Sequence, residues 1–200
     1  TRMAAERLVQ AEALWSILAP NQFPAAEFDA AWRDVLLYNE HTWGAHCSIS
    51  EPDSPFTQSQ WKIKQQFALQ ADERAHTLLR RALERQPQPT TVTAIDVWNT
   101  TSWVRTDLVV CETDLPLAGQ VVKDLAGNLV PSELTRRGHL AFVAQNVPPH
   151  GSRRYVLEAG TPVATGQAKV EGNVLDNGRV RVEVDPNTGT LISLRRAGID

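Results

Sequence analysis

The stretch Ala75–Trp98, AHTLLRRALERQPQPTTVTAIDVW, decides the fold because its hydrophobic period changes partway along. Up to Arg85 the apolar residues recur at helical spacing, and Pro87 and Pro89 then end that pattern. After this Pro-containing linker, Val92–Trp98 is rich in β-branched residues and is typical of a strand. The sequence therefore predicts an α+β fold, in which a helical part precedes a strand-rich part.

Three helices are predicted before the linker, over residues 2–18, 25–39 and about 56–85, and Ser54 or Thr57 is the candidate cap of the third. Each has apolar residues at three- and four-residue spacing, which indicates one buried face. Short connections between them predict an up-down-up bundle. The residues expected on the buried faces are Leu8, Ala11, Trp15 and Leu18; Phe28, Trp32, Val35 and Leu36; Trp61, Ala68, Ala71, Ala75, Leu78 and Ala82.

Short strands with Gly and Pro between them are predicted after the linker, and they favour antiparallel β-sandwich-type structure. Asp176-Asn177-Gly178 has the Asn-Gly dipeptide of tight hairpins, and Asp185–Gly189 is a further turn. The strands are expected at residues 92–98, 107–111, 140–144, 154–157, 173–184 around the Asn-Gly turn, and 190–195.

Three domains follow from this organisation. Residues 1–88 are predicted to form a three-helix domain, 89–165 a small antiparallel β domain, and 166–200 the first strands of a larger, truncated β-sandwich domain. The chain begins inside a helical pattern without Met and stops just after a strand pattern. We therefore expect a fragment that has been cut at both ends.

The composition argues against two classes of partner. The 200 residues have a formal net charge of -3, and basic residues cluster only in pairs, so no nucleic-acid surface is indicated. No apolar run is long enough to suggest a membrane span. Cys47 and Cys111 are compatible with one disulfide or with two free thiols, and the cellular compartment stays open.

The loop at residues 40–54 holds the best candidates for chemistry. His41 follows the second predicted helix, where an imidazole can serve the helix terminus or bind zinc as a neutral ligand. Trp43 lies in a polar loop, which makes it a better sugar contact than the tryptophans on helix faces. Glu40 and Glu51 could form a catalytic carboxylate pair, although solvated loop acids are the commoner case.

Two other motifs have weaker specificity. His46 and Cys47 could join His41 in a metal site, but their spacing matches no standard zinc finger. Asn99-Thr100-Thr101 satisfies the N-glycosylation pattern, a triplet that also arises often by chance.

In the order of these parts the chain resembles the class II α-mannosidases, glycoside hydrolase family 38. The resemblance is carried by the helical module with its histidine-bearing loop, the Pro linker, and three phrases. These phrases are Val97–Arg105 (VWNTTSWVR), Asn177–Asp185 (NGRVRVEVD) and Thr188–Leu191 (TGTL). The resemblance as a whole spans essentially all 200 residues.

The resemblance implies a zinc-dependent retaining α-mannosidase in which a large N-terminal α/β domain carries most of the active site. His41 matches a zinc ligand of the family's His-His-Asp phrase, while Glu40 replaces the first His. Thr42 replaces a sugar-contacting Asp, and Thr42 and Trp43 are expected to line the sugar site. No segment matches the family's His-x-Asp pair or its nucleophilic Asp.

We therefore expect one metal-ligand histidine here, zinc in the complete protein, and an α-mannoside or related carbohydrate as its ligand. The missing N-terminal catalytic domain is the expected partner. By itself the chain should hydrolyse nothing and bind zinc weakly. The alternative is a non-catalytic module that binds carbohydrate or another protein.

Overall fold

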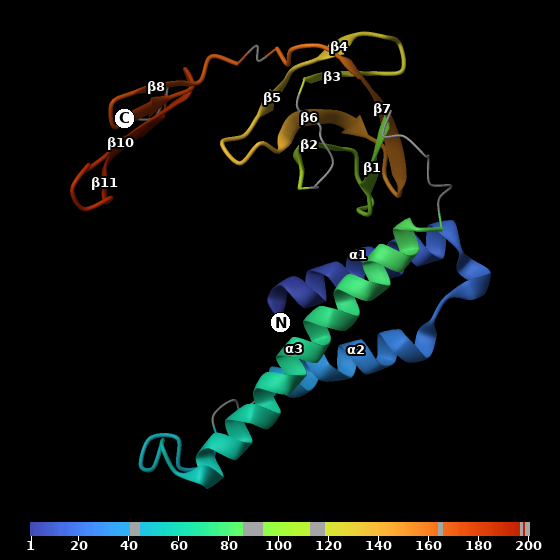
Figure 1. Ribbon diagram of the computed structural model, residues 1–200, viewed down its shortest axis with the longest axis vertical. Helices are drawn as coiled ribbons and strands as arrows, with labels where there is room; N and C mark the ends of the chain where they lie inside the picture. Colours follow the sequence, from blue (N-terminus) through green and yellow to red (C-terminus); the bar gives the residue numbers. More distant parts are fainter. Residues whose placement is uncertain (41–44, 86–93, 113–118, 164–165, 197, 199–200) are drawn as a thin grey trace. The chain divides into compact units, whose positions relative to one another are not determined.

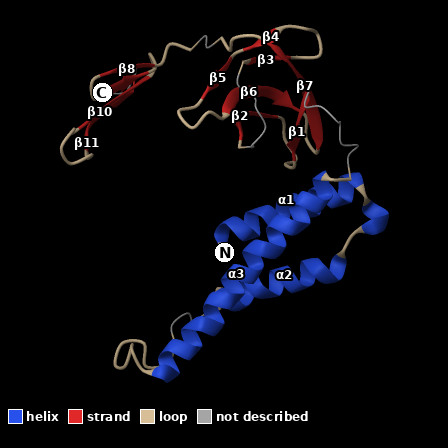
Figure 2. Cartoon of the chain, viewed as in Figure 1, coloured by secondary structure: helices blue, strands red, loops and turns tan. Residues whose placement is uncertain are grey.

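The computed structural model describes residues 1–40, 45–85, 94–112, 119–163, 166–196 and 198 (Figure 1). Within them the fold is α+β as predicted, with three α-helices and antiparallel strands in three sheets (Figure 2). The chain divides into two compact units, residues 1–106 with 145–154, and residues 107–144 with 155–200. The predicted three-domain boundaries stay a prediction.

The helices of the first unit confirm the periodicity argument. They are α1 (Arg2–Leu18), α2 (Ala25–Tyr38) and α3 (Pro55–Leu83), with a short 3-10 turn, η1 (Pro20–Gln22), between the first two. Helix α3 begins where the sequence indicates, because the Ser54 hydroxyl accepts a hydrogen bond of 3.3 Å from the Thr57 amide. Among the described helices, none is long and apolar enough to span a bilayer.

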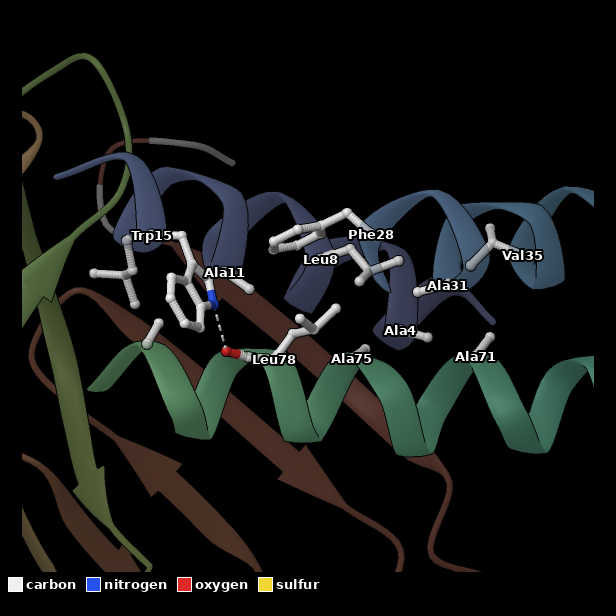
Figure 3. Close-up of a cluster of buried hydrophobic side chains, with 12 residues drawn as sticks. Ala4, Leu8, Ala11, Trp15, Phe28, Ala31, Val35, Ala71, Ala75 and Leu78 are labelled. Atoms are coloured by element: carbon white, nitrogen blue, oxygen red, sulfur yellow. Dashed lines mark hydrogen bonds between the residues drawn. The ribbon is translucent and has the colours of Figure 1, made fainter. Parts of the chain in front are cut away.

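The core of the bundle is built around Trp15 (Figure 3). This side chain is fully buried, and its indole Nε1 donates a 3.0 Å hydrogen bond to the Leu78 carbonyl of α3. Small residues on α3 let α1 pack closely against it. The apolar face of α2 packs on the same core. The cluster comprises Ala4, Leu8, Ala11, Leu14, Trp15, Phe28, Ala31, Val35, Ala71, Ala75, Leu78 and Ala82.

Two predicted core positions are wrong. Leu36 is 67% exposed and Trp61 is 38% exposed. Helix α3 is much longer than α1 or α2 and continues beyond them toward its N-terminus (Figure 1), so no described helix packs against the turn of α3 that carries Trp61. Leu36 lies in α2, outside the buried stripe of Phe28, Ala31 and Val35.

Ion pairs lie along the antiparallel contact between α2 and α3. Glu27 pairs with Arg81, and Asp34 pairs with Arg74 at 3.0 Å, so seven residues forward along α2 correspond to seven residues back along α3. Asp34 is almost fully buried, and a carboxylate in such a place needs a charged partner. A third pair, between Glu40 and Lys64, continues the same direction past the end of α2.

The first strand of the β part belongs to the same unit as the helices. Strand β1 (Ala94–Asn99) places Trp98 against the helical core, and Asp96 accepts two hydrogen bonds, of 2.7 and 2.6 Å, from Arg154. Asn99 is buried, and its amide nitrogen donates to the Trp103 and Val147 carbonyls at 2.7 and 3.1 Å. A glycan would attach to that same nitrogen, so these contacts favour a structural role for Asn99.

Strands β1 to β7 form the first two of the three sheets, whose strand orders are β1-β7-β3-β4 and β2-β6-β5. In the second unit, the rings of Phe142 and Tyr155 meet edge to face, 4.9 Å apart, in the apolar interior. The strands are β2 (Arg105–Cys111), β3 (Gln120–Lys123), β4 (Leu129–Val130), β5 (Ser132–Leu134), β6 (Leu140–Val147) and β7 (Gly151–Ala159).

The third sheet, of order β11-β10-β9-β8, has one apolar and one polar face. Its strands are β8 (Lys169–Glu171), β9 (Val174–Asp176), β10 (Val180–Val184) and β11 (Leu191–Arg196). Directly paired residues share a face, so one face carries the row Val170, Leu175, Val182 and Leu194. The opposite face carries the row Lys169, Asp176, Arg181 and Arg195.

Candidate functional site

The predicted site residues His41, Thr42 and Trp43 lie outside the described residues. The structure does describe what precedes and follows them. Glu40 comes directly after α2 and its cap, and residues 45–54 form the turns that lead into α3. The structure therefore describes the two segments that flank the predicted site, Glu40 on one side and residues 45–54 on the other.

Both flanks are attached to α3. On one side the Glu40 carboxylate forms an ion pair with Lys64, and both side chains are largely shielded from solvent. On the other side the His46 amide donates a 3.2 Å hydrogen bond to the Gln60 side-chain oxygen. Gln60 and Lys64 are one helical turn apart, so α3 holds the two flanks at adjacent positions.

The loop at 45–54 packs on the first turns of α3. Thr57 is fully buried, and its hydroxyl donates to the His46 carbonyl at 3.2 Å. Trp61 donates from Nε1 to the Ser48 hydroxyl at 3.3 Å. The sequence assigned Trp61 to the helical core, but its indole bonds to this loop and is 38% exposed.

The described residues do not by themselves make a metal site. Among them, no three His, Cys, Asp or Glu side chains form a group that could hold a metal. The Glu40 carboxylate is paired with Lys64. The His46 ring lies edge-on to the Phe56 ring, with the two ring centroids 6.3 Å apart. A zinc site needs at least three protein ligands, so a site that uses His41 would need others from outside these residues.

Both cysteines are free thiols, which settles the alternative of an intrachain disulfide. Burial raises the pKa of the Cys111 thiol, so little of it is the reactive thiolate at neutral pH.

Exposed apolar side chains surround the start of α3. Ile49 is 98% exposed, Phe56 is 60% exposed and Ile63 is 59% exposed. Phe56 and Ile63 are seven residues apart and therefore share a face of α3. This surface was not predicted from the sequence, although the seven-residue spacing of Phe56 and Ile63 was a signal for it. Exposed apolar patches typically mark interaction surfaces.

Comparisons with known proteins bear on the fold. No protein-family model matches the chain, and no curated protein matches it. Solved structures do match, among them an α-mannosidase from Enterococcus faecalis V583, with a TM-score of 0.63 and 17% sequence identity. That match covers 95% of this chain and 26% of the mannosidase, so the chain spans about a quarter of that protein's length. The chain thus has the fold of part of an α-mannosidase, and membership of glycoside hydrolase family 38 stays a prediction.

Proposed function

We propose that this chain is part of a glycoside hydrolase that acts on α-mannosides. The observation that carries the proposal is the structural likeness to an α-mannosidase along 95% of the chain, helices and strands together. A likeness of this extent takes in both the helical part and the strand-rich part, rather than only a common helical bundle. Fold alone does not define an activity, so the site residues carry the rest of the proposal.

Within such an enzyme, His41 is proposed to bind zinc, and Thr42 and Trp43 to contact the sugar. The attachment of both flanks to α3 supports this assignment, because a metal ligand needs a rigid support. Zinc would hold sugar hydroxyls and orient the ring. The other ligands and the catalytic carboxylates would come from an N-terminal catalytic domain.

The exposed apolar side chains at the start of α3 support the same proposal. Ile49, Phe56 and Ile63 offer a surface on which a further domain would pack against α3 and the loop at 45–54. The chain is then a supporting module that presents one ligand to an active site built mainly by that domain.

The test is a His41→Ala substitution in the full-length protein. We expect zinc content to fall and kcat/KM on a synthetic α-mannoside to drop by more than about 100-fold, because loss of a direct ligand exceeds the effect of outer-shell changes. His46→Ala is the matched control, since it removes a nearby imidazole that the proposal leaves unused.

Equal zinc content in the wild type and His41→Ala would contradict the metal role. The 200-residue chain alone should show no turnover. A full-length protein that binds saccharide but hydrolyses none, with or without His41, would favour the non-catalytic module instead.

A further inference from the structure

A polar hollow lies over strands β8, β9 and β10, on the charged face of the third sheet. Its volume is about 610 Å³, within the range of sites that accept small molecules. The register explains its lining, because the paired strands place their charged residues side by side on one face. The hollow is lined by Gly166, Gln167, Lys169, Glu171, Val174, Asp176, Gly178 and Arg181.

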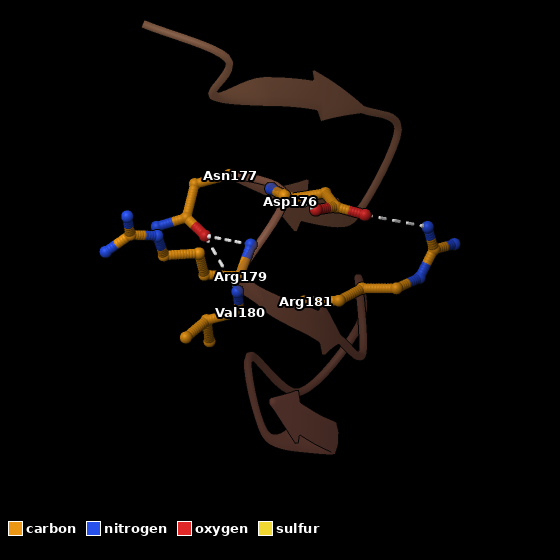
Figure 4. A network of polar contacts seen from close by, with 6 residues as sticks. Asp176, Asn177, Arg179, Val180 and Arg181 are labelled. Carbon is orange, nitrogen blue, oxygen red and sulfur yellow. Dashed lines mark hydrogen bonds and ion pairs between the residues drawn. The ribbon is translucent and has the colours of Figure 1, made fainter. Parts of the chain in front are cut away.

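The β9–β10 turn holds one side of the polar hollow in place (Figure 4). Asn177 Oδ1 accepts hydrogen bonds from the Arg179 and Val180 amides at 3.0 and 2.7 Å. Gly178 has a φ of +78°, and a Cβ added there would come within 3.1 Å of Gln167 Oε1. The absence of a side chain at Gly178 therefore leaves room for Gln167 beside the turn.

Asp176 is a fixed acceptor in the polar hollow. Its carboxylate accepts a 2.8 Å hydrogen bond from the Gly178 amide. The same carboxylate pairs with Arg181 at 3.3 Å (Figure 4). The Gly178 hydrogen bond, followed by Arg181 and Lys169, holds the pKa of Asp176 below its usual range. The group is therefore ionised at neutral pH and presents oxygen acceptors only.

The lining selects the chemical class of the ligand. Two cations, Lys169 and Arg181, are balanced by two carboxylates, Glu171 and Asp176, so the polar hollow favours a neutral ligand over an ion. Among the described lining residues Val174 is the one apolar side chain and none is aromatic, which disfavours a flat or hydrophobic ligand. A ligand with many adjacent donors and acceptors fits best.

We propose that the polar hollow is an accessory binding site for a neutral saccharide. Lys169 and Arg181 donate to sugar hydroxyl oxygens, while Glu171 and Asp176 accept from sugar hydroxyl groups. The choice of a saccharide among neutral polyols rests on the proposed function. Such a site would hold glycan near the enzyme, with weak affinity because no ring stacks on the sugar.

The test is a titration of the 200-residue chain with methyl α-D-mannoside, followed by backbone amide NMR. We expect saturable shifts at Asp176, Gly178 and Lys169, and no comparable shifts with inorganic phosphate. Shifts with phosphate but not with mannoside would show an anion site and overturn the proposal, as would no saturable shift with either probe.

Matched variants assign the effect to the polar hollow. Glu171→Gln and Arg181→Gln should each weaken mannoside binding about tenfold, as expected for loss of one charge-assisted hydrogen bond. Glu183→Gln and Arg195→Gln lie on the same face outside the lining and should leave affinity unchanged. An equal loss of mannoside affinity in the lining variants and in the control variants would contradict the assignment.

A glycine pair provides a second check. Gly178→Ala introduces a Cβ beside Gln167, whereas Gly189→Ala has a similar positive φ of +71° but nothing within 4 Å. Both variants share the backbone strain, and only Gly178→Ala should reduce binding. His41→Ala should not alter it, so failure of the accessory site and failure of the proposed hydrolytic role are separately visible.

Discussion

The helical bundle and the third sheet use their apolar residues in opposite ways. In the bundle, three helices turn their apolar faces toward one another, and Leu8, Ala11 and Trp15 are fully buried. In the sheet, Val170 and Leu194 lie on the apolar face yet are 71% and 64% exposed. Three packed helices can enclose a core among themselves, whereas one sheet has a face that only another layer can cover.

The largest expected effect tests the closed core of the bundle. Trp15→Ala should lower the free energy of unfolding by about 3 to 5 kcal/mol, because it leaves a large cavity and strips the Leu78 carbonyl of its indole donor. Urea unfolding followed by circular dichroism measures the loss. A loss below about 1 kcal/mol would show that the bundle collapses around the site and is not a closely packed core.

A smaller effect tests the buried charge between α2 and α3. Asp34→Ala should cost about 1 to 3 kcal/mol, because Arg74 loses its partner but is itself partly exposed and can recover solvent. The double variant Asp34→Ala with Arg74→Ala isolates the pair in a thermodynamic cycle. Strict additivity of the two single losses would mean that the ion pair contributes nothing.

A near-neutral substitution tests the open face of the sheet. Leu194→Ala should change the free energy of unfolding by less than about 0.5 kcal/mol, since most of the side chain already contacts water. The same urea assay applies. A cost comparable to that of a core leucine would reveal that a second layer covers this face in solution.

The smallest effect concerns pH and the sheet's polar face. The lowered pKa of Asp176 means that its ionised form stabilises the folded sheet above the pKa of the unfolded chain. This contribution is lost as the pH falls through the lower folded value. Asp176→Asn should flatten the acid dependence of the Gly178 amide shift in NMR. If the Gly178 amide shift kept its acid dependence in the variant, another group would be responsible for it.

Much of the fold could be predicted because its signals are local. All three helices match the predicted segments to within two residues at each end, and Ser54 caps α3 as its sequence position indicates. Strands β3, β4, β5 and β8 were not predicted, since segments of two to four residues are too short to show a period of two. Their place depends on the strands they pair with.

The candidate site at His41, Thr42 and Trp43 stays a prediction from the sequence. His41 stands out because it follows a helical pattern, and the structure adds that Glu40 and His46 on either side are attached to α3. The polar hollow was not predictable. Lys169, Asp176 and Arg181 become neighbours only through strand register, which separate polar positions in the sequence do not reveal.

The sequence by itself determined the helices, the Ser54 cap of α3, the change of period after residue 85 and the Asn-Gly turn, because each depends on hydrogen bonds and sterics between near neighbours. Tertiary structure decided which apolar residues are buried. Trp15 and Trp61 both lie on apolar helical stripes, yet only Trp15 faces another helix. Burial is a property of the surface opposite a side chain, and that surface comes from residues far away in the chain.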